Sequence, residues 1–495
     1  MNTSSSPAGA QPPSGDADSD RIDPALRRMT LTLIVGALAV IFDTTIMSVA
    51  IDNLAGQLHT SIDTIQWVST AYLLSLSATM PAVGWAQSVL GGKRLWLVGL
   101  GVFLAGSLLC AVAWNAPSLI AFRVLQGIGG GTLMPLMTTL IMQAAKGRNI
   151  GKVMSLITVP TALGPVIGPV IGGIILHLGD WRWIFLFNVP FCIVGGYLAA
   201  RYLPADGPRT RTPLDVIGML LLSPGVAAVI YGLSELGGPD RFASLKVGLP
   251  LIAGLVLVVG YVGWALRRGS KAVLDVRLFR HRALASSSAG IFLSGAALYG
   301  TMLLLPLYWE EVRGESALGA ALLLIPQGVG TLASRSLAGR YMDRFGPRPV
   351  AIAAFVITFA ATLPFGFVTA STSNIALMAV LFARGVGLGA AMISLQGAAF
   401  IGLGRADIPQ GSSISRVAQQ IGGSAGTAVL AMILQRTAAG AHTPAALALG
   451  FGHAFWWAAA FTGAAVPLCL LLPGRISSPE PQIQGAKPDE EPVEV

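Results

Sequence analysis

The chain has 495 residues, of which 54% are hydrophobic and 11% charged, and its formal net charge is +9. Soluble domains carry about 25% charged residues, so most of this chain cannot face water. The positive charge does not indicate nucleic acid as a partner, because the basic residues fall in short loops between long apolar blocks. The composition therefore predicts an all-α membrane protein embedded in the lipid bilayer.

In chain order, residues 1–28 come first and are predicted to form a disordered cytoplasmic tail, because their beginning is rich in Ser, Pro and Asp. No cleavable signal sequence is expected, since the first apolar block is itself a full span. Blocks of about 20 apolar residues, enough to cross a bilayer as a helix, then recur along the chain. About 14 spans are predicted, at 29–51, 64–88, 95–114, 117–143, 152–176, 182–203, 213–233, 245–266, 283–309, 316–338, 347–369, 373–397, 409–435 and 450–472. Residues 473–495 are predicted to be a second disordered cytoplasmic tail.

The distribution of Lys and Arg predicts the orientation of these spans. If the N-terminus is cytoplasmic, most basic residues lie in cytoplasmic segments, whereas the opposite loops hold only Arg182, Arg241, Lys246, Arg313 and Arg436. Both termini are therefore predicted to be cytoplasmic. The Ala- and Gly-rich composition favours a bacterial source, and hence a multi-pass protein of the bacterial inner membrane.

Two glycine-rich stretches occur twice, which predicts an internal duplication. Gly84–Gly91 resembles Gly339–Gly346 at an offset of 255 residues, and Gly127–Gly131 resembles Gly385–Gly389 at an offset of 258. A chance match is the alternative for such short runs, but the two offsets support one another. Repeated halves are typical of secondary transporters. The predicted units are a six-helix bundle (29–203), two additional spans with a basic linker (204–282) and a second six-helix bundle (283–472).

Asp43 is the one acidic residue predicted to lie deep in a span, and Arg123 is its predicted partner. A buried ionisable group is costly and is retained mainly where it faces a polar cavity or performs work. Counting about 1.5 Å per residue places both side chains roughly 9–12 Å from the outer surface. The hypothesis is that they are coupled and that Asp43 exchanges a proton or binds a cation. The alternative is a carboxylate that only holds two helices together.

The fifth span combines glycines and prolines at a spacing of four residues. Gly164, Gly168 and Gly172 share one helix face and predict a smooth groove. Pro165 and Pro169 remove backbone hydrogen bonds and predict a bend. Such a helix suits a pivot between the two halves, and static packing is the alternative for each single glycine.

Arg384 and Arg416 also fall within predicted spans. Snorkelling to the interface and helix packing are both open for them. The cysteines at positions 110, 192 and 469 lie inside apolar blocks and read as small core residues rather than as a disulfide or a metal site.

Residues 29–472 resemble the fourteen-span drug:proton antiporter branch of the major facilitator superfamily. Phe42–Ala50 resembles the first-helix motif of that branch, and Arg123–Gly127 resembles its fourth-helix motif. The run Gly164–Gly173, which includes Gly173 itself, is similar to the antiporter motif of the fifth helix. Trp181–Pro190 is similar to a signature at the start of the sixth helix, and Asp215 also agrees with the branch.

The resemblance implies roles for these motifs. Asp43, Arg123 and Gln126 would couple protons to substrate, and the fifth-helix motif would mark an antiporter rather than an importer. The repeated stretches that follow the second and tenth spans resemble the cytoplasmic gating motif, which places Gly84, Ser88, Gly91, Lys93, Arg94, Gly339, Asp343, Arg344 and Gly346 at the gate.

The first copy of the gating motif departs from the family pattern. Ser88 stands where the family has an aspartate and Val89 where it has an arginine, whereas the second copy keeps both as Asp343 and Arg344. A carboxylate there favours a neighbouring helix N-terminus. Because Ser88 carries no charge, a weaker cytoplasmic latch is predicted in the first half.

The predicted function is export of a lipophilic, cationic compound in exchange for protons, by alternating access and as a monomer. No cofactor and no metal are expected, since the proton gradient would supply the energy. The alternative is a dedicated exporter of an endogenous metabolite such as an antibiotic, siderophore or lipid, giving self-resistance. Enzymatic activity is not expected, because the sequence has no phosphate-binding loop, zinc-protease motif or nucleophile elbow.

Overall fold

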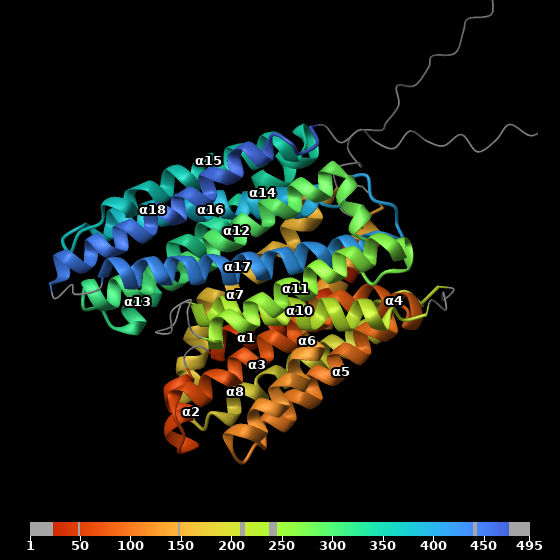
Figure 1. The fold of residues 1–495 in the computed structure, drawn as a ribbon, viewed down its shortest axis with the longest axis horizontal. Coiled ribbons are helices and arrows are strands. Elements are labelled where there is room, and N and C mark those ends of the chain that lie inside the picture. Colours follow the sequence, from red (N-terminus) through yellow and green to blue (C-terminus); the bar gives the residue numbers. More distant parts are fainter. Residues whose placement is uncertain are drawn as a thin grey trace, which may run out of the picture.

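The computed structural model describes residues 23–47, 50–146, 149–207, 213–236, 245–438 and 443–474, so most of both predicted tails lies outside the described residues. Every regular element within these ranges is a helix. In Figure 1, helices α1 to α9 occupy the lower part of the view and α12 to α18 the upper part, and α10 and α11 pass in front where the two groups meet. We refer to α1–α9 as the first bundle and to α12–α18 as the second bundle.

The first bundle contains both long and interrupted helices. Its elements are α1 (Pro24–Ile46), α2 (Ile51–Gln57), α3 (Ile62–Thr79), α4 (Val83–Leu90), α5 (Gly92–Ala111), α6 (Ala116–Ala145), α7 (Ile150–Leu178), α8 (Arg182–Leu186) and α9 (Asn188–Tyr202). A 3₁₀ turn at Met80–Ala82 joins α3 to α4, where Pro81 cannot donate a backbone hydrogen bond. The start of α6 is fixed by a capping box between Asn115 and Ser118.

The remaining helices are the additional pair and the second bundle. The pair is α10 (Val216–Leu236) and α11 (Leu245–Arg268). The second bundle holds α12 (Arg282–Leu307), α13 (Ala317–Leu323), α14 (Ile325–Phe345), α15 (Pro347–Thr362), α16 (Asn374–Ala398), α17 (Ile408–Ala438) and α18 (Pro444–Cys469). The predicted first span, 29–51, is wrong at both ends, because the helix runs from Pro24 to Ile46 and a separate short helix follows it.

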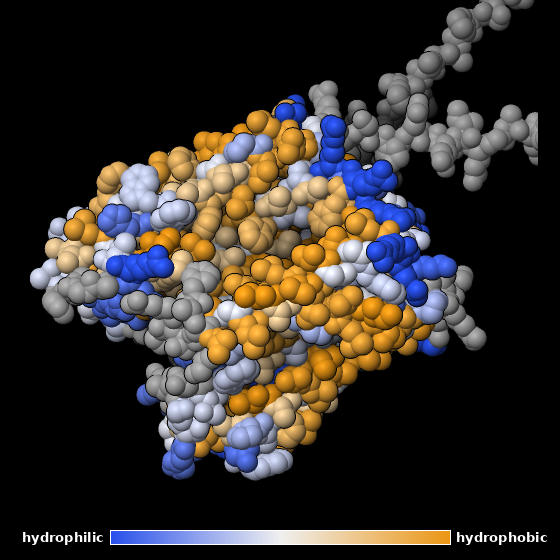
Figure 2. Space-filling model, in the orientation of Figure 1, coloured by the Kyte–Doolittle hydropathy of each residue, from blue (hydrophilic) through white to orange (hydrophobic). Residues whose placement is uncertain are grey.

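Eleven helical stretches of the described part are long and apolar enough to cross a membrane. The predicted spans missing from this set are 64–88, which divides into α3 and α4; 316–338, which divides into α13 and α14; and 152–176, which lies in α7. Figure 2 shows hydrophobic side chains gathered across the middle of the face in view. Helix α11 contributes strongly to this surface, with Leu249, Ile252, Val256 and Val259 all exposed. The protein is therefore a multi-pass membrane protein.

The two bundles are joined at the end that carries the basic loops, which we call the basic end. Asp343 of α14 accepts hydrogen bonds from the backbone N–H groups of Gly151 (2.8 Å) and Lys152 (3.2 Å) at the start of α7. Ser412 of α17 donates to the carbonyl oxygen of Pro135 in α6 (2.8 Å). At the opposite end, the described apolar residues form separate clusters in the two bundles. The structure thus shows the two bundles sealed together at the basic end.

Candidate functional site: a buried ion pair and its surroundings

Asp43 and Arg123 form an ion pair inside the first bundle. Asp43 lies one turn before the end of α1, and Arg123 lies in the second turn of α6. Arg123 Nη1 is 2.6 Å from Asp43 Oδ2, and both side chains are only 1% exposed. The structure therefore brings together the two residues that the sequence singled out, and it encloses them in protein.

Neutral amides complete the surroundings of the Asp43 carboxylate. Gln126 Nε2 and Asn188 Nδ2 each donate to Asp43 Oδ1 at 2.9 Å. Gln126 also accepts from Arg123 Nη1 (2.7 Å) and donates to Ser107 Oγ of α5 (2.7 Å). Both carboxylate oxygens are therefore engaged, and helices α1, α5, α6 and α9 meet at a single polar cluster. Because hydrogen bonds are stronger in a low dielectric, such a network is rigid when complete.

Helix α3 contributes an aromatic ring and a backbone carbonyl to the contacts of the Arg123 guanidinium. The Arg123 Cζ atom lies 4.0 Å from the centre of the Tyr72 ring, a cation–π distance. Arg123 Nε donates to the carbonyl oxygen of Val68 (3.1 Å). Of these partners, the sequence predicted Gln126 but gave no such role to Asn188, Ser107 or Val68. Asn188 lies in the sixth-helix signature quoted above, which is the one signal that could have found it.

The glycine face of α7 packs against α1, the helix that carries Asp43. A Cβ atom on Gly164 would overlap the side chain of Ile41, and one on Gly168 would overlap that of Thr45. A Cβ on Gly172 would lie 3.1 Å from Ile46, whereas one on Gly173 would meet nothing within 4 Å. The glycine face of α7 thus packs inside the first bundle, while the helix also packs against α14 of the second bundle. The backbone at Pro165 and Pro169 belongs to the same helix, and their side chains lie outside the described residues.

A second polar cluster occupies the corresponding place in the second bundle. Arg384 is 1% exposed and donates to Gln327 Oε1 (2.6 Å), Thr362 Oγ1 (3.3 Å) and the carbonyl oxygen of Ala297 (3.2 Å), and it also bonds Thr301. The glycine-run offset of 258 residues (127 to 385) relates Gln126 to Arg384, and it relates Asp43 to Thr301. An arginine therefore stands where the first bundle has an amide, and a threonine stands where it has the carboxylate.

The two copies of the predicted gating motif are held differently. Gly91 and Gly346 both have φ of 87°, a conformation that favours glycine. Gly339 approaches the backbone of Gly151 so closely that a Cβ would lie 3.0 Å from its carbonyl oxygen. Asp343 binds the N-terminus of α7 as described above, whereas Arg344 is exposed at the end of α14.

In the first copy, the carboxylate comes from elsewhere in the chain. Ser88 Oγ donates to the carbonyl oxygen of Trp85 (2.7 Å), and Gly84 packs beside Pro409 of α17. Asp206, which follows α9, accepts from the backbone N–H groups of Lys93 (2.8 Å) and Arg94 (3.2 Å) and so caps α5. At the first copy, the carboxylate of Asp206 binds within the first bundle. At the second copy, the carboxylate of Asp343 links the two bundles.

The sequence matches the family described as Major Facilitator Superfamily over residues 33–427. Among curated proteins, it is 35% identical over 431 residues to the multidrug resistance protein B homolog of Mycobacterium tuberculosis strain H37Rv, covering 86% of this chain and 80% of that protein. It is also 30% identical over 401 residues to the putative multidrug resistance protein MdtD of Serratia proteamaculans, with 79% and 82% covered.

Solved structures share the fold. A crystal structure of the human organic anion transporter MFSD10 superposes with a TM-score of 0.62 at 15% identity, covering 90% of this chain and all (100%) of that one. A mutant of XylE superposes with a TM-score of 0.66 at 14% identity, covering 92% and 97%. At these identities the likeness concerns the arrangement of the helices.

Proposed function

Because this chain belongs to the major facilitator superfamily, whose members are transporters rather than enzymes, we propose that it exports lipophilic small molecules in exchange for protons. The two curated relatives described above carry the name of multidrug resistance proteins, which supports drug efflux. In this proposal the protein crosses the bacterial inner membrane about 14 times as a monomer, with both termini in the cytoplasm. Two units, 29–203 and 283–472, act as moving bundles. The third unit, 204–282, supplies the additional pair of spans. The proton gradient supplies the energy without a cofactor.

The observation that carries the proposal is the buried Asp43 carboxylate, both of whose oxygens accept hydrogen bonds. Arg123, Gln126 and Asn188 all direct N–H donors at its oxygens. A proton on the carboxylate would remove the negative charge that Arg123 faces, and a proton on Oδ1 would also compete with the two amide donors for its lone pairs. Protonation therefore weakens the cluster, which links proton binding to movement of α1, α6 or α9.

Asn188 offers a way for the cluster to accommodate that proton. Its Oδ1 atom is buried and makes no hydrogen bond with the described protein groups. Rotation of the amide by half a turn would present this acceptor to the O–H group of a protonated Asp43. The cluster then has one arrangement for the charged carboxylate and another for the neutral acid, as a proton-coupled switch requires.

The test is substrate-triggered proton release from energised inverted membrane vesicles, followed with a pH-sensitive dye and a panel of lipophilic compounds. We expect release with the wild-type protein and none with Asp43→Asn. The control is Asp180→Asn, which removes a carboxylate that pairs with Arg182 at 2.8 Å but is 42% exposed. Such surface pairs contribute little, so this variant is expected to behave as wild type.

Each other outcome has a defined meaning. Release that persists in Asp43→Asn would place the proton site elsewhere and contradict the proposed mechanism. No response of the wild-type protein to any compound would favour the dedicated metabolite exporter over the drug exporter.

A further inference from the structure

The described charges inside the two bundles are not balanced. Among the described side chains that are buried or half-buried and lie three or more residues from a helix end, there are one carboxylate, Asp43, and three arginines, Arg123, Arg384 and Arg416. The side chain of Arg335, in α14, lies outside this set because it is not among the described ones. Asp43 neutralises Arg123. Among the described residues, neither Arg384 nor Arg416 forms an ion pair. Two positive charges inside the bundles therefore lack a counter-charge.

Every nitrogen of the Arg384 guanidinium is hydrogen-bonded, without a counter-charge. Four neutral oxygen acceptors surround its guanidinium, and its side chain is enclosed among α12, α14, α15 and α16 of a single bundle. It is thus accounted for as part of the packing of the second bundle.

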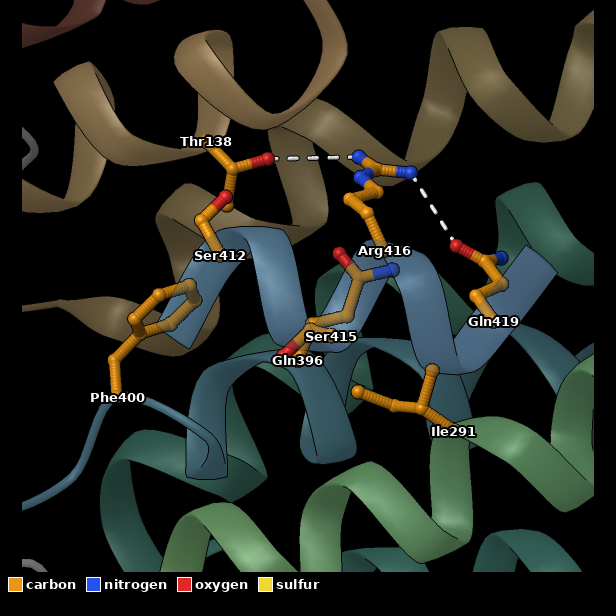
Figure 3. A pocket seen from close by; sticks show the side chains of 8 residues that line it. All are labelled: Thr138, Ile291, Gln396, Phe400, Ser412, Ser415, Arg416 and Gln419. Atoms are coloured by element: carbon orange, nitrogen blue, oxygen red, sulfur yellow. Dashed lines mark hydrogen bonds between the residues drawn. The ribbon is translucent and has the colours of Figure 1, made fainter. Parts of the chain in front are cut away.

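Arg416 is placed differently, because it borders a cavity between the two bundles. Figure 3 shows its side chain on α17 pointing toward Thr138, which belongs to α6 of the first bundle. The cavity of about 10 Å³ is lined mainly by polar side chains, namely Thr138, Gln396, Ser412, Ser415, Arg416 and Gln419. A space of this size holds about one water molecule, so nothing larger enters while the basic end is sealed.

The partners of Arg416 are few and weakly bound. Its Nη2 atom is 3.5 Å from Thr138 Oγ1, and its Nη1 atom is 3.3 Å from Gln419 Oε1, both longer than a strong hydrogen bond. Ser415, which is 6% exposed, has a buried hydroxyl with no hydrogen-bond partner among the described groups. The wall of the cavity therefore holds hydrogen-bond donors that lack strong acceptors, next to an uncompensated cation.

We propose that Arg416 and Ser415 bind an anionic group of the cargo, so that this exporter takes lipophilic acids. The inference rests on the proposed export function and replaces the lipophilic cation predicted from the sequence. An uncompensated guanidinium in a medium of low dielectric repels a cationic cargo and attracts an anionic one. Its planar fork of N–H donors also matches a carboxylate.

The position of Arg416 fits the loading step of an exporter. It lies eight residues after Ile408, the first residue of α17, and hence about 12 Å from the basic end. Parting α6 from α17 would break the long contact with Thr138 and expose the guanidinium to cargo arriving from that end. The counter-charge missing in the sealed state would then be supplied by the cargo.

The test is binding of three dansyl probes to the purified full-length protein in lipid nanodiscs, followed by dansyl fluorescence. The probes share one scaffold: dansyl-leucine, which is anionic; its methyl ester, which is neutral; and its dimethylaminoethyl amide, which is cationic. We expect the anion to bind at least about tenfold more tightly than the others, as one charge-assisted hydrogen bond allows. Arg416→Gln should lower the affinity for the anion to that of the ester and leave the ester unchanged, and Arg416→Lys should retain part of the preference.

The control is Arg436→Gln, which removes an exposed arginine from the opposite end of the same helix. The proposal is overturned if the cation or the ester binds as tightly as the anion, if none of the probes binds, or if Arg416→Gln weakens all three alike. Because the readout is binding, these outcomes are independent of proton release in vesicles, which tests the export function itself.

Discussion

At the scale of single residues, the cost of the buried ion pair depends on which partner is changed. Asp43 and Arg123 are each 1% exposed, so neither can be hydrated if the other is removed. Breaking such a pair typically costs about 3–5 kcal/mol, whereas replacing both partners by neutral groups can be close to neutral. Stability and proton coupling can therefore be separated by mutation.

We expect Arg123→Gln to lower the thermal stability of the purified protein, and Asp43→Asn/Arg123→Gln to recover most of it without restoring proton release. The single variant leaves a buried carboxylate without its cation, and the double variant leaves only amides. Unfolding can be followed with a thiol-reactive dye, because Cys110, Cys192 and Cys469 are all buried in the folded protein. A double variant as unstable as the single one would show that the pair is needed for folding itself.

At the scale of helices, α7 links the ion pair to the seal at the basic end. Its glycine face lies against α1 beside Asp43, and its first turn is bound by Asp343 of the second bundle. A side chain on the glycine face would push α1 outward, and overpacking of this kind costs about 1–3 kcal/mol. The helix can therefore transmit a shift of α1 toward the seal.

We expect Gly168→Ala to reduce proton-coupled transport strongly and Gly173→Ala to leave it unchanged. The added methyl group at position 168 would overlap Thr45, two residues from Asp43, and the one at position 173 has open space around it. Transport and thermal stability measured on both variants provide the check. Equal activity of the two would mean that the close approach of α7 and α1 has no role in coupling.

The sequence predicted which helices carry the ion pair, but it could not predict how each helix is rotated about its own axis. Asp43 and Arg123 could be paired because depth along a span follows from residue counting. Asn188, Ser107 and the Val68 carbonyl were missed, because their contribution depends on how α9, α5 and α3 are turned about their axes. For the fifth span, the glycine spacing predicted a smooth face but could not say that this face meets α1, and a pivoting role of this helix stays a prediction.

At the scale of the whole molecule, the seal at the basic end is asymmetric. Asp343 ties the second bundle to the N-terminus of α7, whereas Ser88 bonds a carbonyl oxygen of its own helix. A large hollow of about 1130 Å³ opens beside Ser88, where α4 meets the loop before α17. The second copy thus places a carboxylate between the bundles, whereas position 88 of the first copy carries a neutral hydroxyl group.

We expect Asp343→Asn to shift the protein toward a form open at the basic end, and Ser88→Asp to shift it the other way. Loss of a charged contact with a helix N-terminus, about 1–2 kcal/mol, changes such populations roughly 5- to 30-fold. The effect of Ser88→Asp should be smaller, because both acidic and basic side chains, among them Asp407 and Arg405, border the same hollow and their effects on a new carboxylate partly cancel.

Spin labels at the exposed positions 146 and 348 would report the distance between the bundles, in a background without the three native cysteines. Unchanged distance distributions in both variants would show that these side chains do not set the balance between the two forms.

The unpaired Arg416 also bears on the response of the transporter to voltage. If the cargo is an acid, each exchange of one anion outward for one proton inward moves two positive charges into the cell. At 100 mV, negative inside, the membrane potential would contribute about 4.6 kcal/mol to such a cycle. Exchange of a cation for a proton moves no net charge and would draw nothing from that field. A single side chain without a counter-ion would thus make the exporter electrogenic, able to run on voltage when the pH difference has collapsed.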